Sequence, residues 1–309
     1  MKVKIQITLI LTVLFMILAS TFAYMYKDEI YIFYRDNILK VRDNVNLEKN
    51  EYFKEENYLF VQNTDNFVVK NKQEIINVIY TIINSGQDKF TFFCDDEYFT
   101  CTNDFKEIRE DRALLSNINN YVHPYNSFKE INTIYDNYGN LTIEVNKKYS
   151  EEDIKLINDK VNEIIKSDIK DDMSIKEKIK AIHNNIINNS KYATEDIQKE
   201  NPDVDFSKAG GVLFSGLGIC NSYADAIAIF LEKLDINNYK IASDTHVWNL
   251  VMLDEKWLHL DLTWDDPVTS DGSDKLQFLF FLINNERLNK LNVEMHDFDE
   301  NIYIEATKN

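Results

Sequence analysis

The sequence is poor in cysteine, proline, histidine and basic residues. Its 309 residues include three cysteines, three prolines and five histidines. No Cys-x-x-Cys or His-x-x-x-His pattern occurs, so the sequence predicts neither a metal site nor a cofactor. The three prolines leave no rigid spacer between domains. The formal net charge of -18 argues against a nucleic-acid partner, because phosphate binding requires a basic surface.

The N-terminus holds a long apolar run. Lys2 and Lys4 precede apolar residues from about Ile5 to Tyr26, with a small-residue cleavage point at residues 21–23. This order is typical of an export signal, and the run is also long enough to stay in a bilayer. No cysteine follows it, which excludes a lipoprotein anchor. We expect residues 1–27 to be a signal peptide or, in preference, a membrane anchor, and the remainder to be extracytoplasmic.

The three cysteines divide into a near pair and a single thiol. Cys94 and Cys101 lie seven residues apart, and Cys220 is alone. In an exported protein the pair could form a disulfide, or both could remain free thiols, because spacing does not establish bridge geometry. In the first case Cys220 is left over as an odd thiol.

Residues 28–149 predict a small α/β module without a catalytic pattern. Asn71 and Glu74 begin an apolar-periodic helix that ends at Gly86. The other expected elements are a helical or loosely ordered stalk at 47–60, a strand at 89–94, a helix at 102–122 and a hairpin that turns at Asn137–Asn140. The module could present the rest of the chain to a surface or cover a cleft, and both interpretations stay open.

Residues 150–309 predict a second domain that begins with two capped helices. Ser150 precedes the first, and Ser174 with Glu177 forms a capping box for the second. His183 lies in the second helix beside its apolar stripe, where a packed or surface histidine is expected rather than a metal ligand.

The stretch GLGICNSYADAIAIFLEKL, residues 216–234, places Cys220 between a glycine-rich turn and an apolar helix. If the thiol is buried, packing alone would explain the presence of a cysteine at this position. A nucleophile would also be expected here, since a helix N-terminus favours the thiolate. Gly218 lets the backbone approach a substrate closely, and the Cys220 backbone N–H could bind an oxyanion.

A predicted hairpin downstream supplies a base and a carboxylate. Strands at 246–253 and 256–264, joined by a two-residue loop, give one apolar face. His246 would then pair with Thr263 on the other face, with Asp261 as its diagonal neighbour. Cys220, His246 and Asp261 thus form a candidate nucleophile–base–orienter triad. The rivals are His259 for the base and Asp265 or Asp266 for the carboxylate.

Three blocks, GLGICNSYADA, HVWNLV and KWLHLDLTWDDP, resemble the transglutaminase-like superfamily, which includes transglutaminases and related peptidases. The ending LTWDDP is similar to a branch with bacterial and cytokinesis-associated proteins, which includes kyphoscoliosis-peptidase-like domains. The resemblance implies an α+β, papain-like core in which a nucleophile helix packs on an antiparallel sheet. It also implies that Cys220, His246 and Asp261 are catalytic.

The chain departs from animal transglutaminases, which carry an oxyanion-binding tryptophan well upstream of the cysteine. All three tryptophans here, Trp248 among them, lie downstream. Tyr192 could line the site instead, and Gly218, Tyr223 and Trp248 are further candidates for substrate or oxyanion binding. The second oxyanion donor stays unassigned, and calcium dependence is not carried over.

Three functions follow. The first is a cysteine peptidase or amidase acting on extracellular protein or peptide, cell-wall peptide included. The second is a transglutaminase that cross-links glutamine side chains to amines; it shares the thioester intermediate with the first. The third is a non-catalytic adhesion or scaffold module, which has no physical need for an orienting Asp261.

Overall fold

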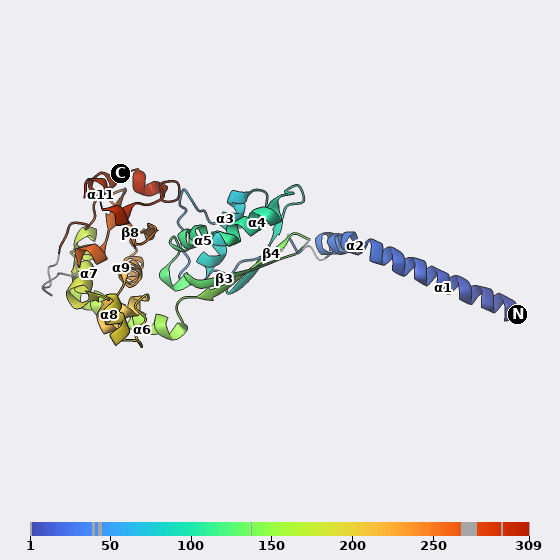
Figure 1. The fold of residues 1–309 in the computed structure, drawn as a ribbon, viewed down its shortest axis with the longest axis horizontal. Helices are drawn as coiled ribbons and strands as arrows, with labels where there is room; N and C mark the ends of the chain where they lie inside the picture. Colours follow the sequence, from blue (N-terminus) through green and yellow to red (C-terminus); the bar gives the residue numbers. More distant parts are fainter. Residues whose placement is uncertain are drawn as a thin grey trace.

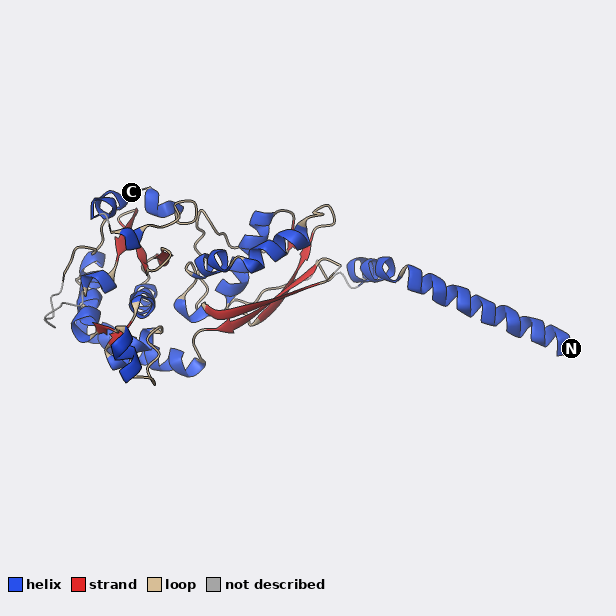
Figure 2. Cartoon of the chain, viewed as in Figure 1, coloured by secondary structure: helices blue, strands red, loops and turns tan. Residues whose placement is uncertain are grey.

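The computed structural model describes residues 2–38, 41–42, 45–136, 138–266, 277–291 and 293–308. The fold is α+β. Figure 1 shows a long N-terminal helix, a central layer of helices on a sheet, and a larger C-terminal body. Figure 2 separates the sheet of the central layer from the short strands of the C-terminal body.

The apolar N-terminal run forms α1 (Lys2–Met25), which projects away from the rest of the chain (Figure 1). Within it, residues Ile7–Met25 bury no side chain and are long and apolar enough to cross a membrane, by length and composition. Helix α2 (Lys27–Phe33) and the π-helix η1 (Tyr34–Ile38) continue towards the body. Arg35 anchors this segment, because its guanidinium is buried and donates to the Tyr138 carbonyl at 2.7 Å.

The N-terminal module contains a four-stranded sheet in the order β1-β2-β4-β3. Strands β1 and β2 are parallel and the other pairs are antiparallel. Three helices pack on the sheet face that carries Phe92, Leu141 and Ile143. Their apolar core is continuous with buried side chains of the C-terminal body, such as Tyr239 and Trp248. The strands are β1 (Val68–Val69), β2 (Lys89–Cys94), β3 (Phe128–Tyr135) and β4 (Asn140–Lys147), and the helices are α3 (Lys72–Ser85), α4 (Cys101–Glu110) and α5 (Arg112–Asn119).

The predicted capped helix, the strand at 89–94 and the hairpin are present; of the hairpin's turn residues, Asn137 lies outside the described residues. The predicted helix at 102–122 is instead two helices, because the Asp111 side chain accepts the Leu114 N–H at 2.9 Å and caps a new helix there. A disulfide joins Cys94 to Cys101 and so ties the end of β2 to the start of α4.

The expectation of a stalk at residues 47–60 is wrong. Residues 45–67 are all described and contain no helix, and Tyr58 and Val61 are buried in the core. Lys54 binds the Asn238 carbonyl and pairs with Glu232 at 2.7 Å, both in the C-terminal body. This segment is therefore packed against both halves of the chain and is not an extended stalk.

The C-terminal body is built around α9 (Cys220–Lys233), whose residues Ser222–Leu231 are all buried. Helix α9 packs on the antiparallel sheet β7-β8-β9 and on α6 and α7. Ser150 and Ser174 cap α6 and α7 in capping boxes. The elements are α6 (Glu151–Asp168), α7 (Ile175–Asn189), β5 (Lys191–Tyr192), α8 (Glu195–Glu200), β6 (Leu217–Gly218), β7 (Asn238–Ala242), β8 (Val247–Leu253), β9 (Lys256–Leu260), α10 (Leu262–Asp265) and α11 (Asn285–Leu291), with the π-helix η3 (Gly211–Ser215) and the 3-10 helices η4 (Glu294–His296) and η5 (Ile304–Thr307). A further 3-10 helix, η2 (Pro124–Asn126), precedes β3 in the N-terminal module.

The β8–β9 hairpin has the predicted register, with Leu253 opposite Lys256 and Val251 opposite Leu258. Asp254 and Glu255 form the two-residue loop with φ values of 50° and 61°, as a tight hairpin turn requires. The predicted strand at 256–264 is too long, however. Strand β9 ends at Leu260, so the pairing of His246 with Thr263 is wrong.

Candidate active site

Cys220 is the first residue of α9, and its thiol is partly exposed. The thiol donates to the neighbouring Asn221 Oδ1 at 3.9 Å. The N–H groups of Ser222 and Tyr223 donate to the Ile219 carbonyl at 2.8 and 3.4 Å. An incoming oxygen would therefore meet the N–H groups that precede them at the start of the helix. The buried helix behind Cys220 fixes the position of the thiol.

Two glycines shape the turn before Cys220. Gly216 has a φ of 64°, in the left-handed region. A Cβ on Gly218 would lie 2.6 Å from Val212 Cγ1 and 2.7 Å from the Ser222 side chain. Gly218 is therefore required for close packing of the turn against α9, whatever its part in substrate binding.

His246 and Asp261 lie side by side at one end of the hairpin. His246 directly precedes β8, and Asp261 directly follows β9, so the antiparallel pair brings them together. His246 Nε2 is 2.6 Å from Asp261 Oδ2. The other carboxylate oxygen accepts the N–H groups of Thr263 at 2.9 Å and Trp264 at 3.2 Å, and Asp261 thereby caps α10.

The electrostatics favour an ion pair between these two groups. Burial alone would lower the pKa of His246, but the Asp261 carboxylate and then the Cys220 thiol outweigh it and raise this pKa to about 10. Burial likewise would raise the pKa of Asp261, but His246 and a second histidine hold it well below its usual range. His246 is thus an imidazolium at neutral pH, and a positive charge beside a thiol favours the thiolate.

The second histidine is His296, which the sequence analysis did not single out. It lies in η4, is buried, and places Nε2 2.8 Å from the same Asp261 Oδ2 atom. Its ring stacks on Phe280 with centroids 4.7 Å apart. Glu294-Met295-His296 matches no motif, so no local signal in the sequence marks this residue.

His246, Asp261 and His296 form a group whose ligand-capable atoms lie within 4.8 Å of one another. A divalent cation could be held by such a set of nitrogen and oxygen atoms. The distances of 2.6 Å and 2.8 Å are, however, those of charge-assisted hydrogen bonds. The three side chains satisfy one another in this way without an ion.

Two of the oxyanion candidates have their donors engaged inside the protein. The Tyr223 hydroxyl is buried and donates to Asp266 Oδ2 at 2.6 Å. The Trp248 indole N–H donates to His259 Nδ1 at 3.0 Å, and its ring stacks on His246 with centroids 5.6 Å apart. Neither donor is free to bind an oxyanion, so Trp248 supports the histidine ring and Tyr223 supports the core.

Tyr192 lies beside His246 at the edge of a cavity. With His246, Trp264 and Met295 it lines a cavity of about 300 Å³. Burial first and the adjacent Cys220 second raise the pKa of Tyr192.

The rival base and carboxylates have structural partners instead. His259 is fully buried, and burial lowers its pKa to about 3, so it is neutral. Asp265 Oδ2 contacts His183 Nε2 at 3.1 Å, which makes His183 a packed histidine as expected. Asp266 binds Tyr223.

A cleft of about 1070 Å³ opens beside Cys220 and His246. Part of its lining comes from the N-terminal module, at the start of β3 and the end of β4: Ser127, Phe128, Lys129, Val145, Asn146 and Lys147. Of the two interpretations left open for the module, this arrangement favours a part in the cleft.

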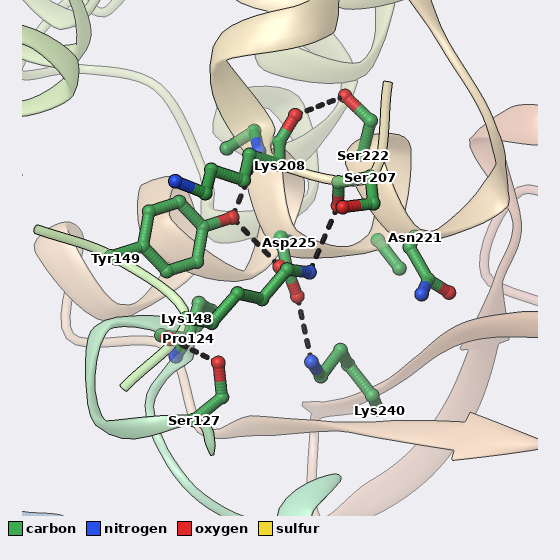
Figure 3. A network of polar contacts seen from close by, with 12 residues as sticks. Pro124, Ser127, Lys148, Tyr149, Ser207, Lys208, Asn221, Ser222, Asp225 and Lys240 are labelled. Atoms are coloured by element: carbon green, nitrogen blue, oxygen red, sulfur yellow. Dashed lines mark hydrogen bonds and ion pairs between the residues drawn. The ribbon is translucent and has the colours of Figure 1, made fainter. Parts of the chain in front are cut away.

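A buried charge network forms the base of this cleft (Figure 3). Asp225 of α9 is fully buried and binds Lys148 and Lys240 at 2.7 Å each. The Tyr149 hydroxyl donates to the same carboxylate at 2.7 Å. Burial would raise the pKa of Asp225, but the two lysines hold it well below its usual range. A single aspartate inside the apolar stretch SYADAIAIF is the sequence signal that could have revealed a paired buried charge.

Residues 159–262 match the family model described as the transglutaminase-like superfamily. Two solved structures are similar: a TGase at 16% identity and TM-score 0.33, covering 44% of each chain, and a candidate cysteine protease from Cytophaga hutchinsonii. The second has 13% identity and TM-score 0.28 and covers 48% of this chain and 65% of its own. The chain thus spans less than two thirds of either neighbour. No curated protein matches it.

Proposed function

We propose that this protein, whose residues 159–262 match the transglutaminase-like superfamily, carries out a thiol-dependent acyl transfer with Cys220 as nucleophile. The observation that carries the proposal is the 2.6 Å contact between His246 and Asp261 next to a partly exposed thiol at a helix N-terminus. A thiol used only for packing would need neither the charged pair nor the opening to the cleft.

The steps follow from the geometry. The Cys220 thiolate attacks the acyl carbon of an amide, and the negative oxygen meets the N–H groups at the start of α9. His246 uses Nε2 to bind Asp261, so Nδ1 is the nitrogen that gives a proton to the leaving amine. The resulting thioester is then released by a second nucleophile, for which the neutral His246 acts as base.

Water is the second nucleophile that the site favours. Cys220 is partly exposed to a wide cleft with many polar lining side chains, such as Asn119, Asn146 and Ser243. Water therefore reaches the thioester, whereas efficient transfer to an amine requires that water be excluded. The proposed activity is that of a peptidase or amidase on protein or peptide, with cell-wall peptide as one candidate.

The proposed location is outside the cytoplasm, with α1 as a membrane anchor. Helix α1 has the length and composition of a membrane span. The Cys94–Cys101 disulfide is consistent with an oxidising compartment.

The test is the alkylation rate of Cys220 by iodoacetamide between pH 4 and 10. Cys94 and Cys101 are bonded to each other, so Cys220 is the free thiol that reports. Wild type should react well below pH ~8.5, where an ordinary thiol is mostly protonated, and His246→Ala should lose this reactivity. Cys220→Ser measures the background. Ordinary thiol behaviour in both proteins would instead indicate a non-catalytic module.

A second assay separates the two kinds of acyl transfer. β-Casein and a fluorescent primary amine are incubated with wild type and with Cys220→Ser. New peptides from the wild type alone indicate hydrolysis. Fluorescent casein without new peptides would assign a transglutaminase in place of the peptidase.

A further inference from the structure

Asp261 accepts from four donors, two of which are histidine rings. Oδ2 lies 2.6 Å from His246 Nε2 and 2.8 Å from His296 Nε2. Oδ1 accepts the backbone N–H groups of Thr263 and Trp264 at 2.9 and 3.2 Å. An ionised carboxylate offers about four lone-pair positions. The four donors therefore fill it.

This arrangement determines where the protons lie. A carboxylate that is filled by donors accepts at Oδ2, so His246 and His296 each carry a proton on Nε2. His246 then presents Nδ1 to the thiol. His296 Nδ1 is a buried nitrogen without a hydrogen-bond partner among the described residues, so its Nε2–H is the only polar contact of the ring there.

Aromatic rings hold His296 in one orientation. Phe280 stacks on it with an interplanar angle of 10°, and Trp248 meets its edge with centroids 4.8 Å apart. Trp264 packs against it at 5.3 Å. Trp248 in turn stacks on His246, so the same aromatic group confines both histidines.

We propose that His296 is a positioning residue, which acts through Asp261 to fix the oxygen atom that orients His246. This inference rests on the proposed function, since it assigns His296 a part in the same triad. The alternative is a histidine that only fills space. In that case an apolar residue of similar size would change stability but not the pH dependence at Cys220.

Among the residues that the structure describes, few titratable groups face His296. Asp261 and His246 contact it or lie beside it, and His259 is close enough for the two rings to influence each other electrostatically. Glu294 and Asp297 lie on its own segment. Of these groups, Asp261 is the one that loses a donor when His296 is replaced.

The experiment compares alkylation profiles of Cys220 for His296→Leu, His296→Gln and a matched control, His123→Leu. His123 is also a buried histidine between aromatic rings, Tyr52 and Tyr125, but it lies in the N-terminal module. In His296→Leu the acidic limb should move up by about one pH unit, because the ionised Asp261 loses one charge-assisted hydrogen bond. His296→Gln keeps an N–H donor and should restore most of the shift, and His123→Leu should show none.

A spectrum of the wild type tests the proton placement without any variant. Nitrogen-15 histidine spectra should show a proton on Nε2 of His296. A ring protonated at Nδ1 alone, or a His296→Leu profile that superimposes on wild type, would overturn the inference. If His246→Ala abolishes reactivity in either case, the proposed function stands while the role of His296 fails. If wild type and His246→Ala both react as ordinary thiols, the proposed function itself fails.

Discussion

Lys148 Nζ lies 2.7 Å from Asp225 Oδ2 and so joins the residue that follows β4 to helix α9. Lys240 reaches the other oxygen of the same carboxylate at 2.7 Å. One buried aspartate therefore links the module, α9 and strand β7.

Replacing Asp225 by Asn should destabilise the whole chain. Two largely buried ammonium groups would lose their counter-charge, and breaking a buried ion pair costs about 3–5 kcal/mol. The free energy of unfolding from urea titration measures the loss. Asp159→Asn removes a well-exposed pair with Lys155 and should cost less than about 1 kcal/mol. Equal losses in both variants would contradict the assignment of Asp225.

The His246–Asp261 pair should make stability depend on pH in a defined window. The pKa of His246 is raised to about 10, so its contribution is complete below the unfolded value of ~6.5 and is lost as pH rises towards 10. The pKa of Asp261 is lowered, so its contribution is present above pH ~4 and is lost on further acidification. The difference in unfolding free energy between wild type and His246→Gln should therefore be largest between about pH 4.5 and 6.5.

The pH dependence of stability that comes from His123 should have the opposite sign, so His123 serves as the comparison. Burial lowers its pKa to about 3, so the unfolded chain binds a proton more readily and stability falls as pH drops below ~6.5. His123→Gln should remove part of this acid sensitivity. A pH-independent difference for His246→Gln would contradict the ion pair.

Gly218→Ala should disturb both packing and reactivity. The new methyl group would lie 2.6 Å from Val212 Cγ1 and 2.7 Å from the Ser222 side chain, so the turn before Cys220 must shift. We expect a loss of about 1–3 kcal/mol in unfolding free energy and slower alkylation of Cys220. Gly210→Ala is the control, because its methyl group would meet only the Phe214 ring, at 3.3 Å. Wild-type alkylation in Gly218→Ala would show that the turn does not position the thiol.

Removing the disulfide should lower stability without changing the site. Cys94 and Cys101 close a short loop, for which the chain-entropy account gives about 2 kcal/mol. The double variant Cys94→Ser, Cys101→Ser should unfold at lower urea concentration but keep the alkylation profile of Cys220. A changed profile would mean that the module's fold controls the thiol directly.

The contact between His246 and Asp261 could be predicted because its determinants are local. The two-residue loop and the alternating apolar residues fix the β8–β9 register, and this register places His246 and Asp261 at one end. The extension of the second strand to Trp264 was wrong because Asp261 caps α10, and no sequence periodicity reports that competition.

The remaining parts of the site depend on contacts between distant segments. His296 reaches Asp261 across 35 residues, through a C-terminal segment that has no repeating pattern. Lys54 reaches Asn238 across 184 residues, which turns an expected stalk into part of the core. Such contacts follow from tertiary packing, which a single sequence does not encode in any local period.

The contacts of the segment around α2 set the distance between the N-terminal helix and the cleft. Arg35 and Asp28 bind Tyr138 at the closed end of the β3–β4 hairpin, whereas the open end of the same hairpin lines the cleft. The eight residues of β3 span roughly 25 Å between these ends. With α1 in a bilayer, the hairpin would hold the thiol at a fixed distance from the lipid headgroups. Substrates would then be selected by the layer they occupy as well as by their chemistry.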